Sequence, residues 1–282
     1  MQDIFEVKAQ VTTQEKVGPD CHLLQLAAPQ IAASARPGQF VNVACSRQYQ
    51  YDPLLRRPLS IYRVSPDTGI IELIYKVRGR GTELLAQKRA GEIVAVLGPL
   101  GKGFDIHEGT SRAILVAGGL GVASLMFLAQ ELAKVALGKG EEPYVHALIG
   151  GHSAEEIICV DDYSALGSPV KVHTWITRAR LEQELEKVLE ELSEQGVKTN
   201  TCSLYTCGPE GMLRRLAAWA QEHQMLCQVS LESHMSCGVG ACQSCICKTS
   251  AGTGNTLEDT WKYSLVCRDG PVFNAEEVIW DE

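Results

Sequence analysis

The chain has 282 residues, of which 45% are hydrophobic and 21% charged, and this composition is typical of two globular domains with a small appendage. Its 26 basic and 34 acidic side chains give a formal net charge of −8, which argues against a nucleic-acid partner because nucleic acid selects a basic face. Residues 1–7 carry no basic region followed by an apolar core, so we expect no secretory signal, a cytoplasmic location and reduced cysteines.

Residues 1–104 are expected to form an antiparallel β-barrel. Alternating or β-branched segments recur between turn signals, and six or so strands at this spacing are typical of a barrel. The predicted strands are 5–11, 21–26, 40–44, 59–64, 70–77 and 92–97. One helical segment interrupts them at 81–88, where Thr82 is the expected cap and the helix N-terminus would bind an anion.

The segment 56–61 contains two arginines, a proline and a serine at the start of a predicted strand. An arginine followed by a hydroxyl three residues later can bind a pyrophosphate or an aromatic ring. Taken alone, paired arginines before a strand are more often solvated. Both interpretations stay open at this point.

Residues 105–228 alternate between strand and helix patterns, which predicts a parallel sheet covered by helices on both faces. The first unit is the uncharged stretch 113–129, which combines a strand, a glycine turn with Gly119 and Gly121, and a helix. It is slightly too short to span a bilayer, so we expect no membrane segment. Ser124 stands where a G-x-G-x-x-G fingerprint has its third glycine, and close packing explains the two glycines equally well.

Another candidate position is the turn Cys207-Gly208-Pro209, which follows a predicted strand. The carboxyl ends of strands are where open α/β sheets bind ligands. Cys207 can equally be a small buried residue at a tight turn, and no neighbouring histidine and carboxylate point to a nucleophile.

Residues 229–282 are expected to form a small loop domain that holds a metal centre. Cys237, Cys242 and Cys245 follow a C-x4-C-x2-C spacing typical of a [2Fe–2S] cluster, with Cys267 as the fourth ligand. Zinc is the rival interpretation, although structural zinc sites usually show two paired C-x2-C or C-x2-H units. Cys247 is then expected to be a small buried residue.

Four segments, at 57–60, 74–76, 79–82 and 97–104, occur in the order seen in ferredoxin–NADP reductase-type flavoproteins, and the chain resembles that family. The resemblance implies that FAD is held by Arg57, Pro58, Leu59, Ser60, Ile74, Tyr75, Lys76, Gly81 and Thr82. Together with the glycine turn, it implies that a nicotinamide nucleotide, NAD(H), contacts Gly119, Gly121, Cys207, Gly208 and Pro209.

With the cysteine motif added, nearly the whole chain resembles the electron-transfer subunits of NAD-dependent dihydroorotate dehydrogenases. The resemblance implies an FMN-containing TIM-barrel catalytic subunit as partner, in a heterotetramer that oxidises dihydroorotate to orotate in pyrimidine synthesis. Electrons would pass between NAD(H) and the partner through FAD and the [2Fe–2S] cluster. Proton abstraction from dihydroorotate would belong to the partner, so no catalytic residue is assigned to this chain.

The chain departs from these relatives in two places. Segment 172–178 replaces an Asp-Asp-Gly-Ser-like stretch near the nucleotide, and a predicted loop tip at 251–256 lengthens the gap between Cys245 and Cys267. Flavoprotein subunits of NAD(P)H:ferredoxin or sulfide-type oxidoreductases are an alternative family, although they tend to carry Asp at the position of Cys237. A zinc-binding regulatory module on a degenerate reductase scaffold is the non-enzymatic alternative.

Overall fold

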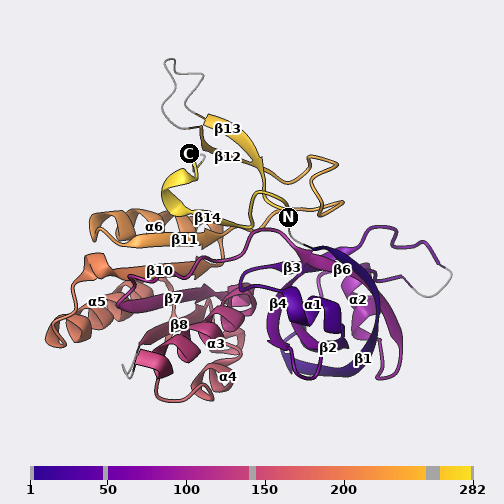
Figure 1. Ribbon diagram of the computed structural model, residues 1–282, viewed down its shortest axis with the longest axis horizontal. Coiled ribbons are helices and arrows are strands. Elements are labelled where there is room, and N and C mark those ends of the chain that lie inside the picture. Colours follow the sequence, from indigo (N-terminus) through magenta and orange to yellow (C-terminus); the bar gives the residue numbers. More distant parts are fainter. Residues whose placement is uncertain (1–2, 47–49, 140–143, 252–260, 281–282) are drawn as a thin grey trace.

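The computed structural model describes residues 3–46, 50–139, 144–251 and 261–280 of the protein. Figure 1 shows a barrel formed by the first part of the chain, a helix-covered sheet beside it, and the C-terminal segment above both. This order agrees with the predicted fold class.

Six strands close into the barrel in the order β1-β2-β5-β4-β3-β6, and neighbouring strands run antiparallel. Alternate side chains, such as Leu24 and Leu26 on β2, fill the interior because side chains of a strand alternate between its faces. The predicted barrel is confirmed. Its strands are β1 (Phe5–Gly18), β2 (Cys21–Ala27), β3 (Phe40–Val43), β4 (Arg57–Ser65), β5 (Ile70–Lys76) and β6 (Ile93–Leu100), with the helices α1 (Pro29–Ser34) and α2 (Arg80–Ala86).

The expectation that Thr82 caps a helix was wrong in its position. Helix α2 begins at Arg80 with Gly79 as the preceding residue, so Thr82 is the third helical residue. Its hydroxyl reaches back to accept hydrogen bonds from the backbone N–H groups of Arg78, at 2.9 Å, and Gly79, at 3.3 Å. Thr82 therefore closes the turn that leads into the helix.

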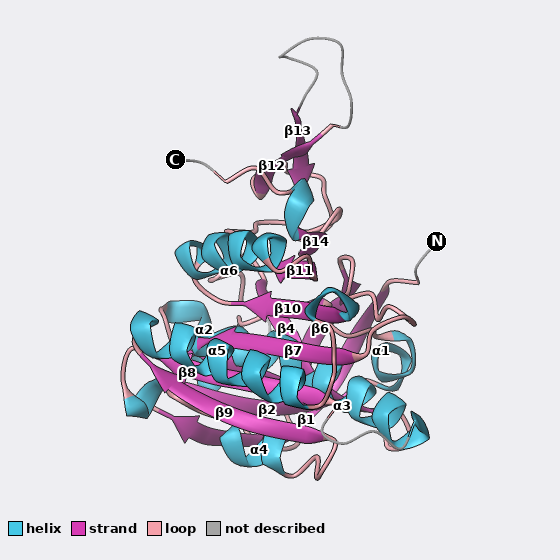
Figure 2. Cartoon of the chain, turned by 90° about the vertical axis from the view of Figure 1, so that its left-hand side faces the viewer, coloured by secondary structure: helices cyan, strands magenta, loops and turns pink. Residues whose placement is uncertain are grey.

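The second sheet has the order β14-β11-β10-β7-β8-β9, in which the first strand is antiparallel and the other five are parallel. Residues of β7 alternate between two cores, one under α3 and α4 and the other under α5 and α6 (Figure 2). The predicted parallel sheet with helices on both faces is confirmed. Its elements are β7 (Arg112–Gly118), α3 (Val122–Lys139), β8 (Val145–Gly151), α4 (Val160–Ser164), β9 (Val170–Ile176), α5 (Arg178–Glu194), β10 (Cys202–Cys207), α6 (Glu210–Glu222), β11 (Leu226–Ser230) and β14 (Val272–Asn274), with 3-10 turns at Gly119–Gly121, Ala154–Glu156, Thr199–Thr201 and Ala275–Glu277.

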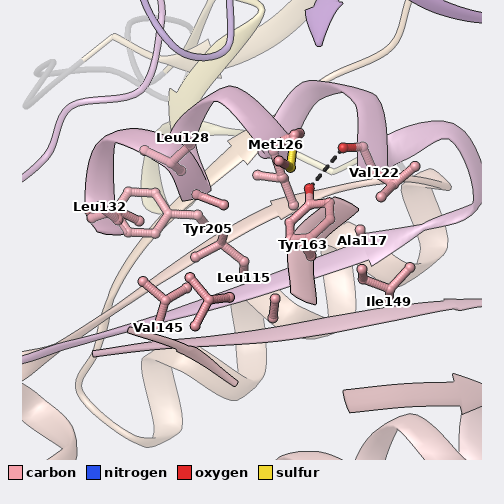
Figure 3. Packing of buried hydrophobic residues seen from close by; sticks show 14 of the residues in the cluster. Leu115, Ala117, Val122, Met126, Leu128, Leu132, Val145, Ile149, Tyr163 and Tyr205 are labelled. Carbon is pink, nitrogen blue, oxygen red and sulfur yellow. Dashed lines mark hydrogen bonds between the residues drawn. The ribbon is translucent and has the colours of Figure 1, made fainter. Parts of the chain in front are cut away.

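Helix α3 packs between the sheet and the barrel. Phe127 belongs to the barrel core, whereas Met126 and Leu128 belong to the sheet core, part of which is drawn in Figure 3. The segment Gly119–Gly138 is long and apolar enough to cross a membrane, but 67% of its most apolar window is buried inside the protein. Its apolar character is therefore explained by these two packing surfaces.

The C-terminal segment connects back to the sheet in a way that the sequence did not indicate. It supplies the edge strand β14 and a separate two-stranded ribbon of β12 (Ile246–Ser250) and β13 (Trp261–Leu265). Strand β11 runs across the expected boundary between residues 228 and 229, so the division of the chain stays a prediction. Of the predicted loop tip at 251–256, residues 252–256 lie outside the described residues.

The buried Tyr163 of α4 provides a test of the packing around α3. Its hydroxyl donates a hydrogen bond of 2.9 Å to the carbonyl oxygen of Val122 at the start of α3 (Figure 3). We expect Tyr163→Phe to lower the free energy of unfolding by about 1 kcal/mol, because one buried hydrogen bond is lost with little change in volume. Chemical denaturation measures this change. The exposed Tyr263→Phe is the control and should change stability by less than about 0.5 kcal/mol; equal losses would contradict the prediction.

Candidate functional site

A cavity of about 470 Å³ opens between the barrel, the first turn of α3 and the segment that follows β11. Strands β4 and β5 and helix α2 supply most of its wall. All nine residues predicted to hold FAD line this cavity: Arg57, Pro58, Leu59, Ser60, Ile74, Tyr75, Lys76, Gly81 and Thr82. The structure thus brings together three segments that are separated in sequence.

The charges around this cavity suit a phosphate-containing ligand. Arg57, Lys76, Arg78 and Arg80 line it, against the single acidic side chain of Glu232. Basic side chains that converge in this way bind pyrophosphate through charge-assisted hydrogen bonds. The donor set therefore fits the pyrophosphate of FAD, and the apolar residues of the wall fit its ring systems.

Gly81 lies directly against the Arg57 side chain in the wall of this cavity. A Cβ atom at residue 81 would lie 2.8 Å from Nε and 3.0 Å from Cζ of Arg57, so only glycine lets the guanidinium rest on the first turn of α2. The position of the Arg57 side chain thus depends on the missing side chain of residue 81.

Gly81→Ala should therefore displace the Arg57 guanidinium and weaken FAD binding by at least about tenfold, since hydrogen bonds to charged groups contribute about 1.5–3 kcal/mol. Fluorescence titration of the flavin-free protein with FAD measures the dissociation constant. Gly109→Ala is the matched control because a Cβ atom at Gly109 would meet no atom within 4 Å. Unchanged FAD affinity in Gly81→Ala would argue against this role.

A second cavity, of about 560 Å³, lies at the carboxyl ends of the parallel strands. Gly119, Gly208 and Pro209 line it, as expected for a nucleotide at this edge of an α/β sheet. Gly121 and Cys207 lie behind its wall: a Cβ atom at residue 121 would be 2.0 Å from the carbonyl oxygen of Cys207. Their role is close packing of the two turns.

The surroundings of Cys207 do not suit a nucleophile. It is 1% exposed, and burial, together with the nearby charge of Glu232, raises the pKa of its thiol to about 12. The thiol is therefore protonated at neutral pH, whereas the thiolate is the nucleophilic form.

The lining of this cavity includes residues that were not predicted from the sequence, among them Arg215, Trp219 and Glu232. Trp175 also lines it. Trp175, within the divergent segment 172–178, packs on Gly150 at the end of β8, and Arg215 forms an ion pair with Glu182. No spacing rule connects these positions, because strand β9, helix α6 and the segment after β11 meet only in the folded chain.

The two cavities adjoin. Lys76, Arg78, Leu120 and Glu232 line both of them. Atoms packed around the carboxyl group of Glu232 raise its pKa, and the charge of Arg78 opposes this effect. A dinucleotide in one cavity and a flavin in the other would therefore meet at this common wall.

The cysteine loop is anchored to the barrel. Asn42 of β3 donates a hydrogen bond of 2.9 Å to the carbonyl oxygen of Cys237. Gly238 passes so close to this amide that a Cβ atom would lie 2.1 Å from Asn42 Nδ2, and its φ of +72° also favours glycine.

Backbone N–H groups face the sulfur atoms of three of the four predicted cluster ligands, Cys237, Cys245 and Cys267. Cys242 N lies 3.4 Å from Cys237 Sγ, Cys267 N lies 3.4 Å from Cys245 Sγ, and Gly240 N lies 3.1 Å from Cys267 Sγ. Hydrogen bonds from Ser244 lower the pKa of Cys242 to about 6, which favours the metal-binding thiolate. The donor set fits an iron–sulfur cluster, whose sulfur ligands accept such bonds.

Another group of side chains could also hold a metal ion. Among the described residues, His146, His173 and Glu191 have their ligand atoms within 4.8 Å of one another.

The histidine pair itself has the geometry of a direct hydrogen bond. Nδ1 of His146 and Nε2 of His173 are 3.3 Å apart, and the two rings are stacked with their centroids 5.5 Å apart. One ring donates to the other when it carries its proton on the facing nitrogen.

Cys247 differs from its expected state because it is half-buried on β12, and not fully buried. Cys267→Ser should abolish the cluster, whereas Cys247→Ser should retain it, since only Cys267 meets the ligand loop through the N–H of Gly240. Iron content and visible absorbance of anaerobically purified protein measure the outcome. The reverse result would identify Cys247 as the fourth ligand.

Comparisons with known proteins agree with these sites. Residues 8–104 match the family model described as an oxidoreductase FAD-binding domain, and residues 232–279 match the iron-sulfur cluster binding domain of dihydroorotate dehydrogenase B. The chain is 34% identical over 281 residues to the dihydroorotate dehydrogenase B (NAD(+)) electron transfer subunit of Desulforamulus reducens, with 100% of both chains covered. The corresponding subunit of Bacillus caldolyticus is 35% identical, with 95% of this chain and 96% of that protein covered.

Solved structures show the same fold at lower sequence identity. The structure of an NADH-dependent reduced ferredoxin-NADP oxidoreductase matches with a TM-score of 0.73 at 24% identity, covering 97% of this chain and 90% of that chain. A ferredoxin reductase of carbazole 1,9a-dioxygenase matches with a TM-score of 0.63 at 18% identity, covering 79% and 67%. Given its full-length relatives, the chain belongs to the family of dihydroorotate dehydrogenase B electron transfer subunits.

Proposed function

We propose that this chain is the electron-transfer subunit of a cytoplasmic dihydroorotate dehydrogenase and passes electrons between NAD(H) and an FMN-containing TIM-barrel catalytic subunit in a heterotetramer. The observation that carries the proposal is the common wall of the flavin and nucleotide cavities, formed by Lys76, Arg78, Leu120 and Glu232. Hydride transfer needs its donor and acceptor close together, and the shared lining residues support this because they place the two cavities next to each other.

FAD, when bound, exchanges a pair of electrons with NAD(H) as hydride, and a [2Fe–2S] cluster carries electrons one at a time. The residues of the chain position these groups. The cations around the flavin cavity bind phosphates, Gly119 and Gly208 let a dinucleotide approach the strand ends, and the cysteine loop holds its metal near the surface, where Cys242 is exposed.

The same observations support three domains in the chain, each with its own ligand. We propose a flavin domain at 1–104, a nucleotide domain at 105–228 and a cluster domain at 229–282. No residue of this chain is assigned as an acid or base for dihydroorotate: Cys207 stays protonated behind the wall, and Glu232 lies at the nucleotide cavity.

A second candidate is the flavoprotein subunit of an NAD(P)H:ferredoxin or sulfide-type oxidoreductase. The observation in its favour is the likeness of fold to the NADH-dependent reduced ferredoxin-NADP oxidoreductase structure. Cys237 at the first cluster position and the full-length relatives named above favour the dihydroorotate assignment.

Co-purification with the FMN subunit encoded in the same cell provides the test. We expect the purified complex to reduce NAD⁺ with dihydroorotate, because electrons from the partner must leave through this chain. A complex that carries Cys267→Ser should lose NAD⁺ reduction but keep dihydroorotate oxidation with an artificial acceptor dye. If the wild-type complex reduces ferredoxin with NADH and yields no NADH from dihydroorotate, the second candidate replaces the first.

A further inference from the structure

Ser124 links helix α3 to the wall of the flavin cavity. It is 5% exposed and lies in the first turn of α3, at the place where a dinucleotide fingerprint carries its third glycine. Its Oγ is 2.9 Å from Oγ of Ser60 on strand β4, and both residues line the flavin cavity. A serine at this position of the glycine turn thus makes a polar contact with the barrel that a glycine cannot make.

The two hydroxyls come from different parts of the fold. Ser124 belongs to α3 and Ser60 to β4, so their contact exists only where the sheet meets the barrel. Either oxygen can be the donor at this distance. A hydroxyl group donates one hydrogen bond and accepts up to two. The contact with Ser124 therefore fixes the rotation of the Ser60 hydroxyl and leaves Ser60 able to form a further hydrogen bond in the flavin cavity.

We propose that Ser124 is a positioning residue that fixes the orientation of the Ser60 hydroxyl beside the flavin. The inference rests on the proposed function, because it requires FAD in this cavity. The polar nitrogen and oxygen atoms of a flavin ring change their charge and hydrogen-bonding character on reduction, so a hydroxyl of fixed orientation beside them changes the reduction potential. Ser124 then acts on the flavin through Ser60 and without contacting the nicotinamide.

A double-mutant cycle of Ser124→Ala and Ser60→Ala tests this proposal on the FAD-loaded protein. We expect each single variant to shift the visible spectrum of bound FAD, to change its midpoint potential and to slow its reduction by NADH about fivefold, the equivalent of one hydrogen bond of about 1 kcal/mol. The double variant should match Ser60→Ala alone, because Ser124 has no effect once its target is absent. Ser124→Thr keeps the hydroxyl and should restore the spectrum and potential.

Ser164→Ala is the matched control, since this serine hydroxyl bonds to the carbonyl oxygen of Val160 at an exposed site. It should leave the flavin spectrum unchanged. The proposal is overturned if Ser124→Ala leaves the spectrum and the potential unchanged, or if the two alanine substitutions have additive effects. Wild-type protein that binds no flavin would instead overturn the proposed function, and this inference with it.

Discussion

Helix α3 belongs to two hydrophobic cores at once, and the arrangement of the rest of the chain depends on this. Phe127 fills the barrel core while Met126 and Leu128 fill the core of the sheet. Residues of the barrel, among them Tyr62 and Ile74, extend into the sheet core in turn. Apolar packing of this kind is dense and resists sliding, so the barrel and the sheet hold one relative position. The common wall of the two cavities is a consequence of that position.

The C-terminal segment is held by both of these parts. Its strand β14 adds an edge to the sheet, and the cysteine loop is bonded to Asn42 of the barrel. The side chains beneath it, including Phe40, Leu213 and Phe273, form a further core to which barrel, sheet and tail all contribute. The metal centre therefore rests on the parts of the chain that surround the flavin and nucleotide cavities.

Much of the fold was predictable because it depends on local periodicity. Alternating strands in the first hundred residues and the strand–turn–helix units that follow them each leave a pattern with a period of two or 3.6 residues. The nine flavin-cavity residues were predictable for a different reason: they occur in short motifs whose order resembles that of known flavoproteins. Strand β14, with three residues, is too short to leave any such pattern.

The sequence by itself determined the type of each domain, the chemistry of the cysteine loop and the residues that surround the flavin cavity. Only the tertiary structure decided that Gly121 and Cys207 pack behind the nucleotide cavity, that Trp175, Arg215, Trp219 and Glu232 line it, and that Ser124 meets Ser60. The physical reason is that these contacts join segments far apart in the chain. Their geometry is set by how α3 packs between barrel and sheet, and local patterns carry no record of that packing.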